Sequence, residues 1–327
     1  MTINHQITLD ADLNWQLTSG TIPTPAADEL LIKVLATSLN PVDLKRRTVT
    51  KTVLGYDGYG EIIACGTAVT DWHAGQLVYY AGTTQKDGSF QDYQVVTAAI
   101  CALAPTGLTV SETAGLPLVS LTAYELLFEQ FHFPAQANAN LGKKLLIING
   151  AGGVGSIMSQ LAKWTGFEVY ATSSPSHFDW LTSNGVGFPI DYHNDRSHKT
   201  LADYPDQTFD AIAVLYDMTD YLPEITRLIK PFGQVGSIVG TAEPLALTLL
   251  KAKSISFAWE YMFTKTDYNY QVASQGQILQ QIANLITAGT LHPITTQDYQ
   301  GLTVATFDAI AAELTTGHLP GKKVIVY

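Results

Sequence analysis

The feature that most constrains this chain is a glycine-rich turn between an apolar strand and a helix. Residues 143–148 read Lys-Lys-Leu-Leu-Ile-Ile, a run typical of a strand that is buried on both faces of a parallel sheet. The residues that follow are Asn149, Gly150, Ala151, Gly152, Gly153, Val154 and Gly155. Three of the glycines have the G-x-G-x-x-G spacing, and this spacing between a strand and a helix indicates a dinucleotide-binding turn.

Each glycine in this spacing has its own task. Gly150 permits a tight turn, Gly152 lets the backbone approach a pyrophosphate, and Gly155 lets the helix pack close to the strand. Apolar residues then recur at helical spacing, at 157, 161 and 164, so the helix directs its first N–H groups at the phosphates. We therefore expect residues 150–155 to bind a cofactor; the alternative is a glycine-rich turn that is merely structural.

The composition excludes several classes of protein. A chain of 327 residues suits about two domains, and 46% hydrophobic residues are enough for a large core. The net charge of −11 repels nucleic acid and anionic membranes, so we expect neither as a partner. The first residues lack a basic region followed by an apolar core, and no apolar run is long enough to span a bilayer. We expect a soluble, cytoplasmic protein.

The pattern of apolar runs divides the chain into two kinds of structure. Between residues 30 and 117 the runs are short and separated by glycine-rich turns, which predicts an all-β barrel or sandwich. The strands are expected at 30–39, 61–64, 76–80, 90–96 and 100–103. The pattern of apolar residues changes after Ser111, and residues 121–129 are predicted to form a helix.

Strands and helices alternate after the glycine turn, which predicts a doubly wound parallel sheet. We expect a strand at 209–216, a helix at 220–229, a turn at 231–233, a strand at 234–239, and helices at 275–288 and 307–314. The chain ends on Val324-Ile-Val, which has the composition of a strand returning to the first domain.

The strand after the glycine turn bears on the choice of cofactor. NAD sites usually place an acid about 20 residues past the turn, where it holds the ribose 2′-OH. Here the strand ends in hydroxyls, and an imidazole follows: Thr172, Ser173, Ser174 and His177. Hydroxyls offer hydrogen bonds to a 2′-phosphate and do not repel it. We therefore favour NADPH, although His177 is equally well explained as a surface residue.

Motifs from nearly the whole chain resemble one family. They are 38–43 (Ser-Leu-Asn-Pro-Val-Asp), 55–60 (Gly-Tyr-Asp-Gly-Tyr-Gly), 88–93 (Gly-Ser-Phe-Gln-Asp-Tyr), 121–124 (Leu-Thr-Ala-Tyr), 150–155, 214–217 (Val-Leu-Tyr-Asp) and 321–324 (Gly-Lys-Lys-Val). In this order they resemble the medium-chain dehydrogenase/reductase superfamily, and within it the zinc-independent quinone oxidoreductases, including the zinc-type alcohol dehydrogenase-like branch.

The resemblance implies an α/β protein with a GroES-like β-barrel catalytic domain and a Rossmann domain. The catalytic domain would comprise residues 1–117 and 265–327, and the Rossmann domain residues 118–264. The active site would lie in the cleft between the domains, and the family's members are commonly dimers, so we expect a homodimer.

The resemblance also predicts that the site holds no metal. Zinc members carry a Cys just after the strand that here ends at Asn40, and Gly-His-Glu where this chain has Gly-Tyr56-Asp. Asn and Tyr are poor zinc ligands. Without a Lewis acid, the easier reaction is hydride transfer to a quinone or an α,β-unsaturated carbonyl. The alternatives are a 2-alkenal or enoyl-thioester reductase, or a non-catalytic relative that senses NADPH or binds RNA.

Three residues are predicted by resemblance to act at the nicotinamide end. Asn40 would line the nicotinamide and substrate, Tyr56 would donate a hydrogen bond to the acceptor oxygen, and Thr122 would contact the nicotinamide. Each has a plainer alternative: Asn40 stabilises a turn, Tyr56 only packs, and Thr122 caps a helix at its N-terminus.

Five further residues complete the predicted cofactor site. By resemblance Tyr192 would meet the 2′-phosphate. Tyr216 and Asp217 end one strand of the sheet, where ligands of α/β proteins gather, and Val239 and Gly240 end the next, where they would pack on the nicotinamide ring.

Overall fold

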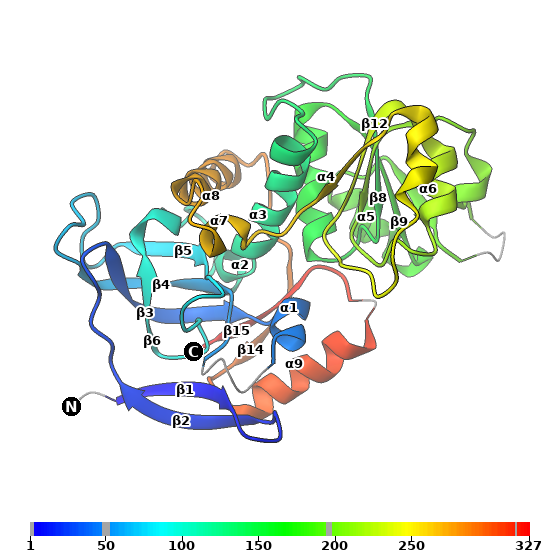
Figure 1. Cartoon of the computed structure of the whole chain (residues 1–327). Coiled ribbons are helices and arrows are strands. Elements are labelled where there is room, and N and C mark those ends of the chain that lie inside the picture. The colour runs from blue at the N-terminus through cyan, green and yellow to red at the C-terminus, as the bar shows by residue number, and fades with distance from the viewer. Residues whose placement is uncertain (1–2, 48–52, 194–197, 318) are drawn as a thin grey trace. The chain divides into compact units, whose positions relative to one another are not determined.

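The computed structural model describes residues 3–47, 53–193, 198–317 and 319–327. The chain forms two compact units (Figure 1). Unit 1 comprises Met1–Leu121 and Met262–Tyr327, and unit 2 comprises Thr122–Tyr261. The sequence led us to expect the borders at 117/118 and 264/265, and the units change at 121/122 and 261/262.

Unit 1 is built on a seven-stranded sheet that confirms the expected all-β domain. Its order is β14 (Thr295–Gln300), β15 (Lys322–Val326), β3 (Glu29–Ser38), β4 (Asp57–Cys65), β5 (Leu77–Ala81) and β7 (Cys101–Leu103), with β6 (Tyr93–Thr97) paired to β3. The inner face buries aliphatic and aromatic side chains from β3, β4, β5 and β6. The closely spaced runs of the sequence were therefore strands of one sheet.

The last strand shows how the C-terminal tail belongs to unit 1. β15 pairs antiparallel with β3, with Val324 opposite Ser38, and parallel with β14. Val324 and Ile325 are fully buried. The strand predicted from Val-Ile-Val thus joins the sheet formed mainly by the N-terminal part of the chain.

The remaining elements of unit 1 cover this sheet or extend beside it. They are the hairpin β1 (Ile3–Leu9) and β2 (Trp15–Thr21), the helices α1 (Pro41–Lys45), α2 (Val110–Ala114), α7 (Thr264–Asp267), α8 (Ala273–Thr287) and α9 (Val304–Thr316), and the 3₁₀ turn η1 (Ala98–Ile100). The sequence analysis did not predict the hairpin. On β2 only Trp15 is buried, so the strand carries a weak apolar signal.

Unit 2 holds the predicted doubly wound sheet. Its six strands are all parallel, in the order β10 (Phe188–Asp191), β9 (Glu168–Ser173), β8 (Lys144–Ile148), β11 (Phe209–Val214), β12 (Ile229–Ser237) and β13 (Ser256–Trp259). In chain order this is 3-2-1-4-5-6, the Rossmann arrangement. The order reverses between β8 and β11, which is where such sheets bind nucleotides.

The helices of unit 2 confirm the alternation expected from the sequence. They are α4 (Gly153–Thr165), α5 (Phe178–Ser183) and α6 (Leu222–Leu228), with the 3₁₀ turns η3 (Pro175–His177), η4 (Leu201–Asp203) and η5 (Leu247–Lys253). The helix predicted at 121–129 begins earlier, as α3 (Pro117–Tyr124), and continues as the π-helix η2 (Glu125–Gln130). Glycine ends α4, with φ +98° at Gly166, a conformation that favours glycine.

One expected turn lies inside a strand. Pro231, Phe232 and Gly233 were predicted to separate a helix from a strand, but they belong to β12, whose pairing with β11 shifts in register there. Phe232 has φ +61° and is 78% exposed. The three residues form an irregularity near the start of β12, which a sequence containing Pro and Gly does not distinguish from a turn.

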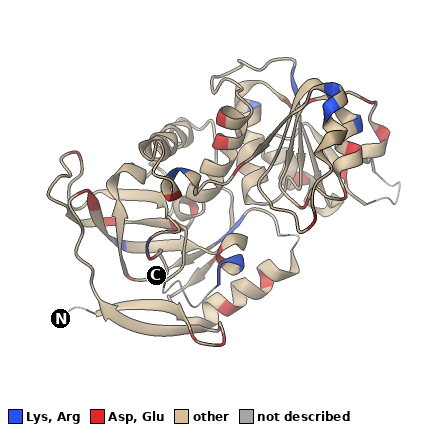
Figure 2. Ribbon diagram, viewed as in Figure 1, with Lys and Arg blue, Asp and Glu red and all other residues tan. Residues whose placement is uncertain are grey.

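The charges and the helix lengths bear on possible partners. Figure 2 shows acidic residues on the ribbons of both units. Within the part of the chain that the structure describes, no helix is both long enough and apolar enough to cross a membrane.

Candidate functional site

The glycine turn has the three-part geometry that its spacing predicts. A Cβ added to Gly150 would lie 2.6 Å from the Cβ of Ala171, and one added to Gly155 would lie 2.4 Å from the carbonyl oxygen of Gly150. A Cβ added to Gly152 meets nothing within 4 Å. Packing therefore requires the first and third glycines, while the second borders open space, as an approach to a pyrophosphate requires.

The helix that follows this turn offers hydrogen-bond donors. Gly152 is the N-cap of α4, and no side chain caps the helix there. The first N–H groups of a helix have no partner within the helix, and they carry partial positive charge. With Gly153, Val154 and Gly155 in the first turn, this end of α4 is suited to bind an anionic group.

Strand β9 holds the glycine turn through hydrogen bonds to Thr172. Asn149, at φ +68°, donates its N–H to the hydroxyl of Thr172 at 2.9 Å, and Gly150 donates its N–H to the carbonyl oxygen of Thr172 at 2.9 Å. Thr172 is only 1% exposed. Its side chain holds the turn, which differs from the role at the 2′-phosphate that the sequence suggested.

Trp180 is a residue that the sequence analysis missed. Its Nε1 donates to the carbonyl oxygen of Ala151 at 3.1 Å and to the hydroxyl of Ser156 at 2.9 Å. The indole thus fixes the backbone of the turn. A tryptophan on α5 carries no local sequence signal for this contact.

Four other predicted residues lie together at the carboxyl ends of β9 and β10. The hydroxyl of Ser173 lies 3.4 Å from Nδ1 of His177, and the hydroxyl of Ser174 donates to that of Tyr192 at 3.3 Å. Tyr192 is 37% exposed. Hydroxyls and an imidazole can donate hydrogen bonds to a phosphate group, and none of these four side chains is a carboxylate that would repel it.

The remaining predicted residues follow β11 and β12. Tyr216 is exposed, and Asp217 accepts hydrogen bonds from the side chain and backbone of Thr219, which lower the pKa of Asp217. Val239 is half-buried and Gly240 is exposed. All four follow the carboxyl ends of parallel strands, so they lie at the edge of the sheet that also carries the glycine turn.

In unit 1, Asn40 belongs to a buried polar group that we call the Lys322 cluster: Ser38, Asn40, Asp57 and Lys322. The ammonium of Lys322 contacts Oδ1 of Asn40 and lies 3.0 Å from Oδ2 of Asp57. The amide of Asn40 donates to the same carboxylate at 2.9 Å, and the hydroxyl of Ser38 also donates to it. Lys322 is 5% exposed, and Asn40 is 2% exposed.

The Lys322 cluster therefore uses both ends of the Asn40 amide. The sequence analysis named Asn40 but missed Lys322 and the carboxylate, because 265 residues separate them in the chain. The side chain of Asn40 fixes a loop through a distant cation. Its contact with a nicotinamide stays a prediction.

Asp43 holds the same loop through its backbone. Its two carboxylate oxygens accept the N–H groups of Asn40, at 2.7 Å, and Gly55, at 3.2 Å. Burial raises the pKa of Asp43 to about 7, and the nearby carboxylate of Asp57 also raises it. The carboxyl group therefore changes protonation near neutral pH.

Tyr56 is fully buried. Its hydroxyl accepts a hydrogen bond from Nε of Arg46 at 3.1 Å, and its ring lies edge-on to Phe263, with centroids 4.7 Å apart. The structure supports the packing alternative for its ring, while donation to an acceptor oxygen stays a prediction.

Thr122 is 5% exposed and lies inside α3. The sequence analysis placed it at the start of a helix, with an N-terminal cap as the alternative, and both placements are wrong because the helix begins at Pro117. Its contact with a nicotinamide stays a prediction.

These positions do not fit a catalytic zinc ion. The two residues that match metal ligands by resemblance, Asn40 and Tyr56, direct their oxygens at the ammonium of Lys322 and the guanidinium of Arg46. Two fixed positive groups repel a divalent cation, and amide and phenol oxygens are poor ligands for zinc. Among the described residues, no group of three or more His, Cys, Asp or Glu could hold a metal ion.

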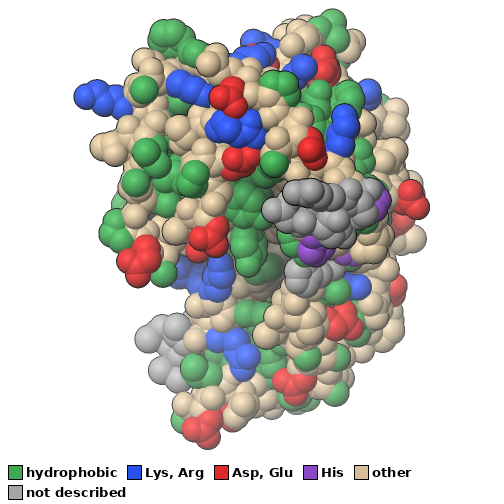
Figure 3. Space-filling view, turned by 90° about the vertical axis from the view of Figure 1, so that its right-hand side faces the viewer, with side chains coloured by type: hydrophobic (Ala, Val, Ile, Leu, Met, Phe, Trp, Pro, Cys, Tyr) green, Lys and Arg blue, Asp and Glu red, His purple; other side chains and the backbone are tan. Residues whose placement is uncertain are grey.

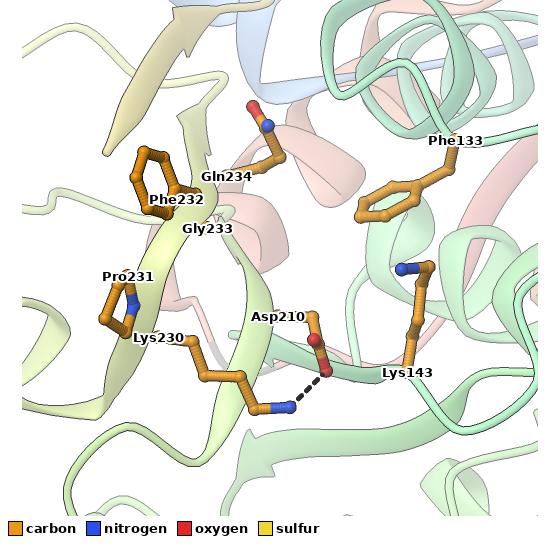
Figure 4. Close-up of a pocket in the computed structure, with 8 residues that line it drawn as sticks. All are labelled: Phe133, Lys143, Asp210, Lys230, Pro231, Phe232, Gly233 and Gln234. Carbon is orange, nitrogen blue, oxygen red and sulfur yellow. Dashed lines mark hydrogen bonds and ion pairs between the residues drawn. The ribbon is translucent and has the colours of Figure 1, made fainter. Parts of the chain in front are cut away.

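A separate hollow in unit 2 lies at the opposite edge of the sheet. Figure 4 shows it lined by Phe133, Lys143, Asp210 and residues 230–234, with Lys230 and Asp210 paired at 2.8 Å. Its volume is about 240 Å³. Lys143 and Asp210 stand near the amino ends of β8 and β11, whereas nucleotides bind outside the carboxyl ends. We therefore do not assign the cofactor to this hollow.

Comparison with known proteins agrees with the fold. Residues 26–106 match the family model of the alcohol dehydrogenase GroES-like domain, and residues 184–325 match that of the zinc-binding dehydrogenases. A crystal structure of a putative zinc-dependent alcohol dehydrogenase from Rhizobium etli is similar over 100% of this chain and 99% of that chain, with a TM-score of 0.90 and 28% identity.

Three curated relatives are similar over most of the chain. A zinc-type alcohol dehydrogenase-like protein of Staphylococcus epidermidis is 36% identical, covering 93% of this chain and 92% of that protein. The NADPH-dependent alkenal/one oxidoreductase of Arabidopsis thaliana is 31% identical, covering 94% and 74%. The 2-methylene-furan-3-one reductase of Solanum lycopersicum is 31% identical, covering 93% and 73%.

A GroES-like barrel and a Rossmann sheet with a glycine turn define an oxidoreductase that binds a nicotinamide cofactor. The chain belongs to the medium-chain dehydrogenase/reductase superfamily and is similar over most of its length to zinc-type alcohol dehydrogenase-like proteins. This confirms the family and the fold class expected from the sequence motifs.

Proposed function

We propose that the protein is an NADPH-dependent, metal-free reductase that transfers hydride to a quinone or an α,β-unsaturated carbonyl. One observation carries this proposal: the side-chain oxygens of Asn40 and Tyr56 accept hydrogen bonds from cationic side chains of the protein, those of Lys322 and Arg46. Without a metal to polarise a simple carbonyl, hydride transfer is easiest to acceptors that are already electron-poor.

The residues of unit 2 would hold the cofactor. The glycine turn and the N-terminus of α4 would bind the pyrophosphate, and Ser173, Ser174, His177 and Tyr192 would bind the 2′-phosphate. Bound NADPH supplies the hydride. The protein's own part is to orient the reactants and to exclude water from the reacting atoms.

Two relatives support an enone as the acceptor. The plant proteins described above carry the names alkenal/one oxidoreductase and 2-methylene-furan-3-one reductase, and the first name includes NADPH. A 2-alkenal or enoyl-thioester reductase on the same scaffold is the nearest alternative.

The test is the oxidation of NADPH and NADH, followed by absorbance, with a benzoquinone, a short enone and an enoyl thioester as acceptors. We expect turnover with the quinone or the enone, faster with NADPH, and unaffected by a chelator. Turnover confined to the thioester would favour the alternative. No oxidation with any acceptor would overturn the proposal, and a requirement for zinc would contradict its metal-free part.

We further propose that the protein acts in the cytoplasm as a homodimer without nucleic-acid partners, as the family resemblance and the charge of −11 suggest. Light scattering after size exclusion measures the subunit number, and tight, salt-sensitive binding of RNA would contradict the last part.

A further inference from the structure

The hollow at the amino ends of β8 and β11 has room for a small ligand. We call it the Phe232 hollow; it is lined by Phe133, Lys143, Asp210 and residues 230–234. Its volume of about 240 Å³ lies below the roughly 300–1,000 Å³ of sites that take drug-sized molecules. A molecule with a single ring and one polar group is therefore of the size that this hollow can hold.

Phe232 lines the hollow in a conformation that its own backbone disfavours. Its φ is +61°, in the left-handed region that bulky residues rarely adopt, and the residue is 78% exposed. The ring thus buries little apolar area that could offset the strain. Strained residues of this kind are concentrated where side chains hold a ligand. The position of Phe232 therefore indicates contact with another molecule.

An irregularity of β12 holds the ring in this position. Strands β11 and β12 pair on both sides of Asp210, but residues 230–233 of β12 lie opposite this one residue. A Cβ added to Gly233 would lie 2.6 Å from Cδ1 of Ile229, so the chain is tightly packed there. Irregular pairing of this kind redirects side chains. The exposure of Phe232 is therefore a property of the sheet and not of a long loop.

A second ring and an ammonium lie on the other side of the hollow. Phe133 packs edge-on against Phe167, with ring centroids 4.9 Å apart, and the ammonium of Lys143 lies 5.7 Å from the centre of the Phe133 ring. Figure 4 shows this ring and this ammonium on one side of the view and Phe232 on the other. Within the described residues the ammonium of Lys143 forms no ion pair or hydrogen bond, so its charge is available to a ligand.

The other charges of the hollow are already paired. The carboxylate of Asp210 accepts the backbone N–H of Lys144 at 2.8 Å and pairs with the ammonium of Lys230 at 2.8 Å. Lys144 directs its own ammonium at Glu168, 3.8 Å away. The charged side chains that line the hollow therefore leave one positive charge, that of Lys143, without a counter-ion.

The protein as a whole does not attract anions. Figure 3 shows basic side chains interspersed with acidic ones on one face of the protein, and the chain carries a net charge of −11. Such a distribution gives a small anion no attraction at long range. Binding of an anion therefore depends on local groups, and the hollow supplies an ammonium together with two aromatic rings.

We propose that the Phe232 hollow binds a small aromatic carboxylate, with its ring between Phe133 and Phe232 and its carboxylate at Lys143. A planar ring can make offset or edge-on contacts with an aromatic side chain on each side. Its single negative charge matches the one ammonium that lacks a counter-ion. The inference does not rest on the proposed function, because the glycine turn lies at the opposite edge of the sheet.

Three molecules of similar size test the proposal on the whole protein: benzoate, benzamide and cyclohexanecarboxylate. Benzamide lacks the charge, and cyclohexanecarboxylate lacks the aromatic ring. Ligand-detected NMR measures the dissociation constants, with NADPH in excess so that the glycine turn is not the site observed. We expect benzoate to bind about tenfold more tightly than benzamide and about threefold more tightly than cyclohexanecarboxylate.

Matched variants assign the binding to the hollow. Lys143→Gln removes the cation, and Phe232→Gly removes the ring and places glycine at a positive φ. Each should weaken the binding of benzoate about tenfold without a marked loss of melting temperature. The controls Lys251→Gln and Tyr268→Ala change an exposed lysine and an exposed tyrosine that do not line the hollow, and both should bind benzoate as the original protein does.

Three results overturn the proposal: no binding of benzoate at millimolar concentration, equal binding of benzamide, or unchanged binding of benzoate in both hollow variants. If Phe232→Gly is unstable, Lys143→Gln decides, because it leaves the backbone of β12 unchanged. A smaller number of subunits in Phe232→Gly, measured by light scattering, would show that the ring packs on a second copy of the chain and would also overturn the ligand site. None of these results bears on the proposed reductase activity.

Discussion

The glycine turn of unit 2 and the Lys322 cluster of unit 1 are opposite kinds of site. The turn consists of consecutive residues, it acts through its backbone, and a Cβ at Gly152 would meet open space. The Lys322 cluster consists of side chains from distant parts of the chain, and it is closed: Asn40 and Lys322 are 2% and 5% exposed.

Because of this difference, the two sites should tolerate substitutions differently. In the turn, a Cβ can be added at Gly152 without displacing protein atoms, so we expect a substitution there to act on a bound cofactor and not on the fold. In the Lys322 cluster every change leaves a buried partner without its hydrogen bond, and removing one partner of a buried ion pair costs more than the pair itself contributes. Four predictions test this contrast.

The largest expected effect on stability follows from removal of the buried cation. Lys322→Met leaves the carboxylate of Asp57 unpaired, and we expect it to destabilise the protein by about 3–5 kcal/mol in urea unfolding. The double variant Asp57→Asn and Lys322→Met removes both charges and should recover at least half of the loss. A single variant as stable as the original would show that the cluster is not the closed site described here.

The glycine turn should separate binding from stability. Gly152→Ala should weaken NADPH binding by about 10- to 100-fold, or 1.4–2.8 kcal/mol, and leave the melting temperature nearly unchanged. Gly155→Ala should lower both, because its Cβ meets the backbone of Gly150. Fluorescence titration and calorimetry measure the two quantities. Equal effects of the two variants on stability would contradict the separate roles.

Unit 2 also contains a closed polar pair, which sharpens the comparison. Glu125, on the π-helix η2, and Glu260, after β13, are 2% and 4% exposed. Burial, and then the neighbouring carboxyl of Glu125, raise the pKa of Glu260 far above its ordinary value. Glu260 thus keeps its proton in the folded protein at a pH where the unfolded chain has released it.

This raised pKa makes stability fall with pH. Above roughly pH 4.3, the ordinary pKa of Glu, the unfolded chain binds fewer protons than the folded protein, so the free energy of unfolding decreases as the pH rises. Glu260→Gln removes this dependence. We expect the variant to gain melting temperature relative to the original protein between pH 5 and pH 8, by roughly 2–4 °C for each kcal/mol. A difference in melting temperature that is the same at pH 5 and pH 8 would contradict the raised pKa of Glu260.

Asp43 should also make the free energy of unfolding fall as the pH rises, but by a smaller amount. Its pKa rises on folding from about 3.8 to about 7, so it lowers stability progressively from about pH 4 to pH 7 and adds no further change above that range. Asp43→Asn removes the titration but leaves one oxygen for the two N–H groups of Asn40 and Gly55, at a cost of about 1–3 kcal/mol. The difference in urea midpoint between variant and original should therefore narrow from pH 5 to pH 8.

Local patterns in the sequence predicted most of the fold. The run at 144–148, the glycine spacing and the alternation after it gave the order of strands and helices in unit 2, because buried parallel strands and tight turns impose their own composition. The errors fell where local signals are ambiguous. Pro231 to Gly233 have the composition of a turn but lie in β12, and α3 begins at Pro117, before the apolar periodicity that suggested it.

The site residues divide in the same way. Gly150, Gly152 and Gly155 could be named because their spacing within one short motif, between a strand and a helix, indicates their tasks. Trp180 and Lys322 could not, since each contacts residues that only the fold brings near it: the glycine turn and Asn40. No spacing rule connects such residues.

The sequence by itself determined the glycine turn between a strand and a helix, because its steric demands belong to a short motif. The mismatch of Asn40 and Tyr56 with zinc ligands came from the family resemblance. The tertiary structure decided what Asn40 and Tyr56 face. Pairing of β15 with β3 brings the ammonium of Lys322 to the loop after residue 38, and burial then requires every polar atom there to find a partner. That requirement depends on contacts across 265 residues of chain, which no local pattern contains.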